Sequence, residues 1–427
     1  MSVPFADVLQ YLYSSLPMYQ RVGANAFKKD LTNTLALCQA LGNPHTRFKS
    51  IHVAGTNGKG SSSHMLASIL QEAGYKTGLY TSPHLKSFTE RIRINGKEVP
   101  ETFVIDFVNR MRNRIDHIKP SFFETTVAMA FDYFAQQHVE IAVIEVGLGG
   151  RLDSTNVITP VVSLITNIGY DHTDMLGETL EQIAFEKAGI IKPGVPVVIS
   201  ERQEKTTPVF LKRADECHAP VFFAQDDYQI TQNEKGYEIR KNGNARFTHI
   251  HLPLGGKYQI KNLCGVIKVT EVLSLAGFRL SEQHIYNGLE KVVVNTSLKG
   301  RWQVLNHSPL IICDTAHNAE GLTEVVNQLE AIAYNRLFIV LGLVKDKDHE
   351  KILSLLPPRA TYFFCQASIP RALAAQELAQ KAAHYGLAGE VVPDVNRAIA
   401  FAREKATPND LIFIGGSTFV VAEINDL

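Results

Sequence analysis

The sequence predicts an α/β fold with two units, each built on a largely parallel sheet. Short apolar runs alternate with helical patterns through almost the whole chain, which is typical of parallel strands joined by helices. A glycine-rich turn with one lysine, residues 55–61, lies between an apolar strand and a helix. The pattern breaks near residues 295–300, and a second strand–helix series follows. The length of 427 residues suggests two or three domains, and we place them at residues 1–297 and 298–427.

The expected strands can be assigned in chain order. In the first unit we expect strands over residues 51–54, 77–81, 141–146, 161–166 and 195–200. A more polar stretch with alternating patterns, residues 221–252, predicts added antiparallel strands, and a helix is expected over residues 262–276. In the second unit strands are expected over residues 310–314, 337–343, 361–365 and 411–414. Ligands of open α/β sheets bind at the carboxyl ends of strands, so polar residues at those ends carry most weight.

Charge and composition exclude several classes of protein. Lys plus Arg equals Asp plus Glu, 43 against 43, so no net charge favours nucleic acid or a membrane surface. The chain begins without a signal-like segment and has no run of roughly 18 apolar residues, so a soluble cytoplasmic protein is expected. Five scattered cysteines make a disulfide framework or zinc cluster a poor interpretation.

The glycine-rich turn is suited to binding phosphate. Glycines let successive N–H groups point at one anion, the following helix offers its positive end, and Lys59 adds a full charge. The string differs from the standard P-loop, because Val53 and Gly60 stand where a glycine and a hydroxyl residue are usual. Gly55 is the first glycine here, and the hydroxyl comes one residue late, at Ser61. An ordinary strand–helix turn with a solvated lysine is the alternative.

Several polar residues follow or end the predicted strands of the first unit. Glu145 is the one carboxylate in an apolar strand, so it needs a metal or an opposite charge, and an ion pair with Arg151 is the alternative to metal binding. The glycines at 147–150 lack dinucleotide-binding spacing, since Leu152 stands where the third glycine would be. His172 lies in a polar loop and is either a second metal ligand or an ordinary loop residue. On spacing alone Lys187 is a surface lysine.

The second unit offers its own polar strand end. Asp314 closes one predicted strand, where it would accept hydrogen bonds from a ribose or orient a base. Helix capping is the alternative and fits Asn318 about as well. Arg301 lies beside the domain boundary, where an arginine would meet ATP phosphates.

Gly-Thr-Asn-Gly-Lys-Gly-Ser at residues 55–61 resembles the ATP loop of the Mur ligase superfamily, and of its folate branch in particular. Four further groups of residues resemble the folylpolyglutamate synthase / dihydrofolate synthase family: 81–84 with 90–93, 145–156, 171–177 with 187–189, and 314–318. The resemblance covers essentially the whole chain. It implies a P-loop-containing, Mur-ligase-like central domain followed by a smaller Rossmann-like α/β domain.

The resemblance also implies roles for individual residues. It implies that ATP is bound by Asn57, Gly58, Lys59, Gly60, Ser61, Asn262, Arg301 and Asp314. One Mg²⁺ would be held by Ser82 and Glu145 and a second by His172, and Lys187 matches a lysine carbamylated by carbon dioxide in the family. The pteroate-binding segments match Ser121, Phe122, Phe123, Glu124, Leu152, Asp153 and Ser154. Lys59, Lys187 and His172 are the residues expected to take part in catalysis.

The implied reaction is ATP-dependent amide formation. A substrate carboxylate attacks the γ-phosphate, and the amine of L-glutamate displaces the resulting acyl phosphate. The expected acceptors are reduced folates and also dihydropteroate, with a monomer as the expected oligomeric state. Residues 23–31 do not align cleanly with the dihydropteroate-contacting loop of the bifunctional bacterial enzymes, so dihydrofolate synthase activity stays open.

Two other functions share features with this sequence. A Mur-type amino-acid ligase of cell-wall synthesis shares the core chemistry, but such enzymes usually carry a uridine-nucleotide domain before the ATP loop. Only 54 residues precede Gly55, and they look helical. A nucleotide-binding switch without ligase activity would not need Glu145, His172 and Lys187 together with a second α/β domain.

Overall fold

The computed structural model describes residues 4–18 and 30–427. Contacts divide the chain into two units. Unit 1 comprises Met1–Gly169, Thr173–Pro253 and Ile260–Ser297, and unit 2 comprises Tyr170–His172, Leu254–Gln259 and Leu298–Leu427. Most of residues 23–31, the segment that aligns poorly with the bifunctional enzymes, lies outside the described residues.

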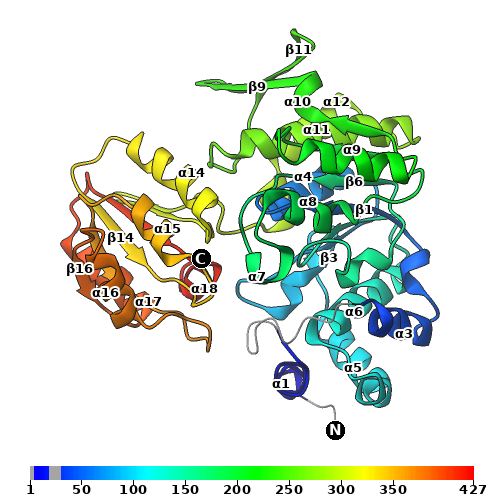
Figure 1. The fold of residues 1–427 in the computed structure, drawn as a ribbon, viewed down its shortest axis with the longest axis horizontal. Coiled ribbons are helices and arrows are strands. Elements are labelled where there is room, and N and C mark those ends of the chain that lie inside the picture. The colour runs from blue at the N-terminus through cyan, green and yellow to red at the C-terminus, as the bar shows by residue number, and fades with distance from the viewer. Residues whose placement is uncertain (1–3, 19–29) are drawn as a thin grey trace. The chain divides into compact units, whose positions relative to one another are not determined.

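Unit 1 is built on an eight-stranded sheet in the order β4-β3-β2-β5-β1-β6-β7-β8. Strands β1, β3 and β6 of this sheet are labelled in Figure 1. The strands are β1 (Lys49–Ala54), β2 (Thr77–Tyr80), β3 (Ile92–Ile94), β4 (Lys97–Glu98), β5 (Ile141–Glu145), β6 (Val162–Ile165), β7 (Val197–Ile199) and β8 (Val221–Phe223). Strands β2, β5, β1, β6, β7 and β8 are parallel, whereas β3 pairs in antiparallel fashion with both β2 and β4. The five strands expected in this unit are present, and β8 corrects the expectation of purely antiparallel strands after residue 221.

Register brings the ends of the central strands together. Val53 of β1 lies opposite Glu145 of β5 on one side and Leu164 of β6 on the other. The segments after β1, β2, β5 and β6 therefore leave the sheet at one edge, because parallel strands share their carboxyl ends. This edge holds the glycine-rich turn.

Helices cover both faces of the unit 1 sheet. They are α1 (Phe5–Ser15), α3 (Thr32–Ala40), α4 (Lys59–Glu72), α5 (Glu101–Ile118), α6 (Phe122–Gln136), α7 (Thr173–Leu176), α8 (Leu180–Ala188), α9 (Thr207–Glu216), α10 (Ala224–Asp227), α11 (Gln259–Leu275), α12 (Glu282–Glu290) and α13 (Val292–Thr296), with short 3-10 turns η2 (Pro44–Thr46), η3 (Phe88–Arg91) and η4 (Ser154–Val157). One buried core joins the sheet to α1, α3, α5 and α6, and another joins it to α8 and α9. Within residues 4–18 and 30–427, no helix is both long and apolar enough to cross a membrane.

A small antiparallel sheet follows β8 in unit 1. It consists of β9 (Tyr228–Asn233), β10 (Gly236–Lys241) and β11 (Asn244–Ile250), in the order β11-β10-β9. The alternating pattern expected for this stretch is present in β10, where Tyr237 and Ile239 are buried. Helix α11 begins at Gln259, three residues before the expected start.

Unit 2 contains a six-stranded sheet in the order β12-β13-β17-β14-β15-β16. Its strands are β12 (Gln303–His307), β13 (Leu310–Cys313), β14 (Leu337–Leu341), β15 (Thr361–Phe364), β16 (Gly389–Val391) and β17 (Leu411–Gly415), and all but β12 run parallel. Helices α14 (Ala319–Glu330), α15 (His349–Leu355) and α16 (Ala375–Ala383) pack into one core, and α17 (Val395–Lys405) and α18 (Thr418–Glu423) into another. The four expected strands are present, whereas β12 and β16 were not expected.

Candidate active site

The turn after β1 is held in shape by the segment that follows β6. The Thr166 hydroxyl donates a hydrogen bond to the Asn57 carbonyl oxygen at 2.6 Å. The Asn57 amide donates to the side-chain oxygen of Asn167, and the Thr56 amide donates to the Asn167 carbonyl, each at 2.8 Å. These bonds use backbone groups of Thr56 and Asn57 and so fix the conformation of the turn without a ligand.

Two glycines of the turn have positions that no other residue would fit. Gly55 and Gly58 both have positive φ, at 145° and 86°. A Cβ on Gly55 would overlap the Thr166 hydroxyl, and a Cβ on Gly58 would overlap the Asn262 side-chain oxygen. The close approach at Gly58 brings Asn262 of α11 beside the turn. Gly58 and Asn262 would have to lie side by side if both contact one nucleotide.

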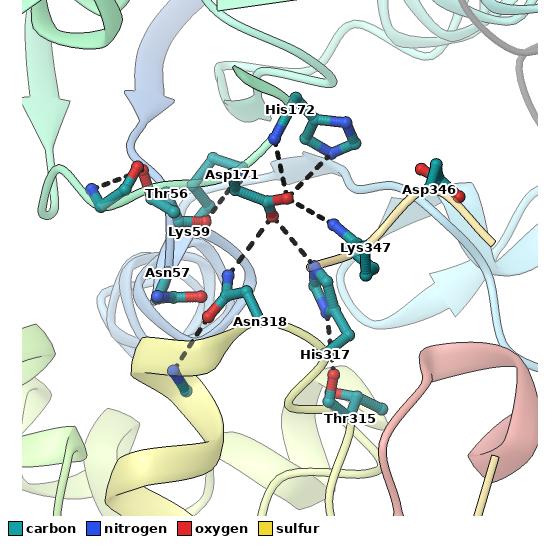
Figure 2. Close-up of polar contacts among 12 residues, drawn as sticks. Thr56, Asn57, Lys59, Asp171, His172, Thr315, His317, Asn318, Asp346 and Lys347 are labelled. Atoms are coloured by element: carbon teal, nitrogen blue, oxygen red, sulfur yellow. Dashed lines mark hydrogen bonds and ion pairs between the residues drawn. The ribbon is translucent and has the colours of Figure 1, made fainter. Parts of the chain in front are cut away.

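Two lysine ammonium groups converge on one carbonyl oxygen. Lys59 Nζ donates to the Gly55 and Thr56 carbonyl oxygens at 2.9 and 3.0 Å, and Lys187 Nζ donates to the same Gly55 oxygen at 2.9 Å. Lys187 is 4% exposed, so it is not the surface lysine that spacing alone suggested. Helix α4 begins at Lys59 (Figure 2). Like charges this close, together with a helix N-terminus, make a strong site for an anion.

The ends of β2 and β5 supply oxygen ligands. The Ser82 amide donates to Glu145 Oε2 at 3.1 Å, and Glu145 is 5% exposed. Arg151 instead forms its ion pair with Glu186, at 2.9 Å. The alternative in which Arg151 neutralises Glu145 is therefore wrong, because Glu186 of α8 lies next to Arg151.

The residues that present a metal site are few. Among the residues that the structure describes, no group of three or more His, Cys, Asp or Glu side chains is arranged so that it could hold a metal ion by itself. Ser82 and Glu145 offer hard oxygen ligands, which suit Mg²⁺. Mg²⁺ usually keeps several waters and binds substrate phosphates, so a sparse protein set beside a phosphate-binding turn fits this ion.

Aromatic rings begin helix α6. The Ser121 amide donates to Glu124 Oε2 at 2.6 Å, and the Glu124 amide donates to Ser121 Oγ at 3.2 Å, which makes a capping box. Phe122 is buried and Phe123 is half-buried. Phe123 packs so closely over Gly147 that a Cβ there would overlap its ring. Ser121 and Glu124 thus fix the helix start that presents the two rings.

Asp153 organises the loop after β5. Its carboxylate accepts hydrogen bonds from the Leu148 amide at 2.8 Å and the Thr155 amide at 3.0 Å. Burial raises the pKa of Asp153, although these hydrogen bonds act in the opposite direction. The His52 ring nitrogen Nε2 lies 2.8 Å from the Thr155 hydroxyl, which donates onward to Asp153. Leu152 is half-buried beside it, and Ser154 is buried.

In unit 2, Asp171 is the centre of a cluster of polar side chains (Figure 2). Its carboxylate pairs with Lys347, lies 3.4 Å from His317 Nε2 and accepts a hydrogen bond from Asn318 at 3.3 Å. The His172 amide also donates to Asp171, at 2.9 Å. Burial alone would raise the pKa of Asp171, but the hydrogen bond from His317 and the neighbouring charges hold it well below its usual value. Asp171 is therefore an ionised, fully engaged carboxylate.

The end of β13 carries a second buried carboxylate in unit 2. Asp314 accepts hydrogen bonds from the Tyr258 hydroxyl at 2.6 Å and from the Trp302 and Ala316 amides at 2.7 Å. Arg301 contacts the Thr315 hydroxyl beside it. The capping role falls to Asn318, whose side chain accepts from the Gly321 amide at 2.9 Å at the start of α14.

Comparison with known proteins decides the family. The Mur ligase middle domain profile matches residues 53–270, and the profile described as "Mur ligase, glutamate ligase domain" matches residues 300–418. The dihydrofolate synthase/folylpolyglutamate synthase of Bacillus subtilis (strain 168) is 32% identical over 439 residues, which covers 99% of each chain. The chain belongs to the dihydrofolate synthase/folylpolyglutamate synthase family.

Solved structures of the dihydrofolate synthase/folylpolyglutamate synthase family resemble the whole chain. E. coli FolC in complex with DHPP and ADP matches with a TM-score of 0.88 at 28% identity, over 99% of this chain and 96% of that one. The bifunctional enzyme from Yersinia pestis, complexed with AMPPNP and Mn ion, matches with a TM-score of 0.85 at 30% identity, over 99% and 97%. The expected fold class and family are thus confirmed.

Some residues of the site carry no simple sequence signal. Thr166 and Asn167 shape the glycine-rich turn, and they could have been chosen as candidates because polar residues directly after a parallel strand lie at the edge of the sheet where ligands bind. Tyr258 and Lys347 have no such signal, because Tyr258 precedes a helix and Lys347 lies in a charged loop. Only the folded chain brings them to Asp314 and Asp171.

Proposed function

We propose that this protein is an ATP-dependent ligase that adds L-glutamate to reduced folates and to dihydropteroate. The observation that carries the proposal is the convergence of Lys59 and Lys187 on the Gly55 carbonyl oxygen, beside Ser82 and Glu145. At such a site Lys59 and the N-terminus of α4 supply positive charge for phosphates, and Ser82 and Glu145 supply oxygen ligands for a divalent cation. Membership of a family whose solved members bind ADP, DHPP and AMPPNP with Mn ion supports the same chemistry here.

We assign the nucleotide to the glycine-rich turn and its neighbours. Asn57, Gly58, Lys59, Gly60 and Ser61 offer backbone amides, an ammonium group and a hydroxyl at the start of α4. Asn262, which packs on Gly58, would contact the same nucleotide. In unit 2 we assign Arg301 and Asp314 to the nucleotide, because Asp314 is buried at the end of β13 and the half-buried Arg301 contacts the adjacent Thr315 hydroxyl.

We assign Ser82 and Glu145 to one Mg²⁺ and His172 to a second. A bound Mg²⁺ would neutralise charge on the phosphoryl group as it moves. Glu145 is buried, and the hydrogen bond from the Ser82 amide orients its Oε2 atom at the end of β5. A neutral His172 imidazole is a suitable ligand for a divalent cation.

A carbamate on Lys187 would relieve the crowding of charge near Gly55. Both Lys59 and Lys187 donate to one oxygen, so two positive charges lie close together. Reaction of the neutral Lys187 amine with carbon dioxide forms an N–C bond and releases a proton, which leaves an anion. Like-charge repulsion then becomes attraction between the carbamate and Lys59.

The pteridine would bind between the start of α6 and the loop after β5. Phe122 and Phe123 offer aromatic surface, and Ser121, Glu124, Leu152, Asp153 and Ser154 border it. The substrate carboxylate attacks the γ-phosphorus of ATP and ADP leaves, giving an acyl phosphate. The amine of L-glutamate then attacks the acyl carbon, phosphate leaves, and the amine loses its proton.

Glutamate-dependent ADP release tests the proposal. The assay contains ATP and Mg²⁺ and compares dihydropteroate, tetrahydrofolate and a uridine-linked muropeptide precursor as acceptors. We expect turnover with both pteridines. Turnover with tetrahydrofolate alone would contradict the dihydropteroate activity, and turnover with only the muropeptide would favour a cell-wall ligase instead.

The carbamate assignment has its own test. Lys187→Ala should lower kcat by at least about 100-fold, because the anion near Lys59 is lost, and a short carboxylic acid should restore part of the rate. Lys192→Ala is the matched control, since Lys192 donates to the Asn156 carbonyl oxygen rather than to the turn. Full activity of Lys187→Ala would refute the assignment.

A further inference from the structure

Arg91 is a buried cation at the end of η3 in unit 1. It is 3% exposed. Its Nε donates to His84 Nδ1 at 2.7 Å, and its carbonyl oxygen accepts from the Thr81 amide at 3.0 Å. Arg91 thereby holds the segment that contains Ser82 from both its side chain and its backbone.

The described residues provide no carboxylate that forms an ion pair with Arg91. Arg93, two residues further on, makes the contrast: it is 4% exposed, its guanidinium pairs with Glu98 at 3.3 Å, and it also donates to the Glu90 carbonyl oxygen. Burial lowers the pKa of Arg91, and the nearby Tyr80, Tyr13 and Glu145 side chains offset only part of this. A buried guanidinium without a paired anion is costly.

His84 does not supply the missing negative charge. Its Nδ1 accepts the hydrogen bond from Arg91, so the ring proton is on Nε2 and the imidazole is neutral. The pair therefore carries the positive charge of the Arg91 guanidinium.

The surroundings of Arg91 join the two halves of the proposed acceptor site. The guanidinium carbon lies 5.2 Å from the centre of the Phe122 ring. Tyr80 packs on Phe123 with ring centres 6.2 Å apart, and both Tyr80 and Glu145 act electrostatically on Arg91. The cation thus lies near the aromatic rings assigned to the pteridine and near the carboxylate assigned to Mg²⁺.

We propose that Arg91 binds the substrate carboxylate that becomes phosphorylated. This inference rests on the proposed function, and it adds a residue to the acceptor site. An acceptor carboxylate that enters the site loses its water and needs a cation, and Arg91 needs an anion. A guanidinium that holds one carboxylate oxygen leaves the other oxygen oriented for attack on phosphorus.

Binding of two matched ligands tests the role directly. Calorimetry with AMPPNP and Mg²⁺ compares dihydropteroate with the same molecule lacking its carboxylate. We expect wild-type protein to prefer the carboxylate by roughly 10- to 100-fold, as a charged hydrogen bond allows. Arg91→Gln should bind both ligands about equally. Arg93→Gln, the matched control, should keep the wild-type preference because Arg93 already has Glu98.

Several results would overturn the inference. They are equal binding of the two ligands by wild-type protein, and a wild-type preference retained in Arg91→Gln. Should Arg91→Gln fail to fold, Arg91→Lys decides, since it keeps the charge and loses the planar fork. We expect its preference to be several-fold lower, and an unchanged preference contradicts the role. If no pteridine supports ADP release, the proposed function itself is refuted. If a pteridine does support ADP release but the wild-type protein binds the two ligands equally, only the role of Arg91 is refuted.

Discussion

Three buried polar side chains in unit 1 are held by a hydrogen bond to a backbone group or to a neighbouring side chain. Glu145 accepts from the Ser82 amide, Lys187 donates to the Gly55 carbonyl, and His52 contacts the Thr155 hydroxyl. Each bond offsets part of the cost of taking the group out of water. Groups held in this way keep a defined protonation state and direction, as a binding site requires.

His52 predicts an acid-side loss of stability. Burial, with a smaller effect of Lys192, lowers the pKa of His52 from 6.5 to about 3 in the folded protein. Between these values the unfolded chain binds a proton that the folded chain does not, so stability falls as pH falls. Each unit of pH below about 6.5 should cost roughly 1.4 kcal/mol from this one group.

His52→Gln checks this expectation, because glutamine cannot titrate. Denaturant unfolding at pH 7.5 and pH 5.0 should show a loss about 2 kcal/mol smaller in the variant than in the wild type. The variant is compared with itself at the two pH values, so any general destabilisation cancels. An equal loss in both proteins would contradict the assigned shift.

At the scale of elements, side-chain caps fix the starts of two helices beside the proposed site. Ser121 with Glu124 caps α6, and Thr179 with Gln182 caps α8. Helix α4 differs, because Gly58 with positive φ stands at its N-cap without a side-chain cap. A helix N-terminus that follows a glycine with positive φ is the arrangement that a phosphate-binding turn needs.

Gly58→Ala should impair nucleotide binding. The added methyl group would overlap the Asn262 side-chain oxygen and would strain a residue with positive φ. We expect the KM for ATP to rise at least about tenfold, since a loss of about 1.4 kcal/mol in binding is tenfold. Steady-state kinetics with varied ATP measures this.

Gly74→Ala is a matched control for that substitution. Gly74 also has positive φ, at 84°, but a Cβ there would meet nothing within 4 Å. It should lower stability while leaving the KM for ATP unchanged. A raised KM in Gly74→Ala, or an unchanged one in Gly58→Ala, would contradict the proposed turn.

At the scale of the whole molecule, each unit has its own buried cores. Unit 1 places helices on both faces of an eight-stranded sheet, and unit 2 does the same around six strands. Units with separate cores are able to unfold separately. A loss of core packing in one unit should therefore lower mainly the stability of that unit.

Matched core substitutions test whether the units unfold separately. Leu341→Ala in β14 and Leu164→Ala in β6 each remove a fully buried leucine side chain, so each should cost about 2–5 kcal/mol. Calorimetry should show two unfolding transitions, and each variant should lower the midpoint temperature of the transition that belongs to its own unit. A single transition lowered equally by both variants would show that the units unfold together.

The sequence by itself determined the fold class, the family and most strands. Apolar runs of four to six residues between helical patterns, such as β1 and β14, are decided locally by burial on both faces of a parallel sheet. The glycine-rich turn could also be predicted from the sequence, because glycine permits the backbone conformation of such a turn and lysine carries the positive charge that a phosphate needs. Strands β12 and β16 were missed, since they are short or mostly exposed and lack a clear apolar run.

Only the tertiary structure decided which polar groups meet. It paired Arg151 with Glu186 rather than Glu145, and it brought Lys187 and Lys59 to one carbonyl oxygen. Among the described residues it gave Arg91 no carboxylate as an ion-pair partner. Lys187 lies 132 residues from Gly55 in the chain, and no local pattern encodes that distance. Residues that are neighbours in the sequence determine backbone conformation and the pattern of burial, whereas the partners of charged groups depend on which distant segments meet in the folded chain.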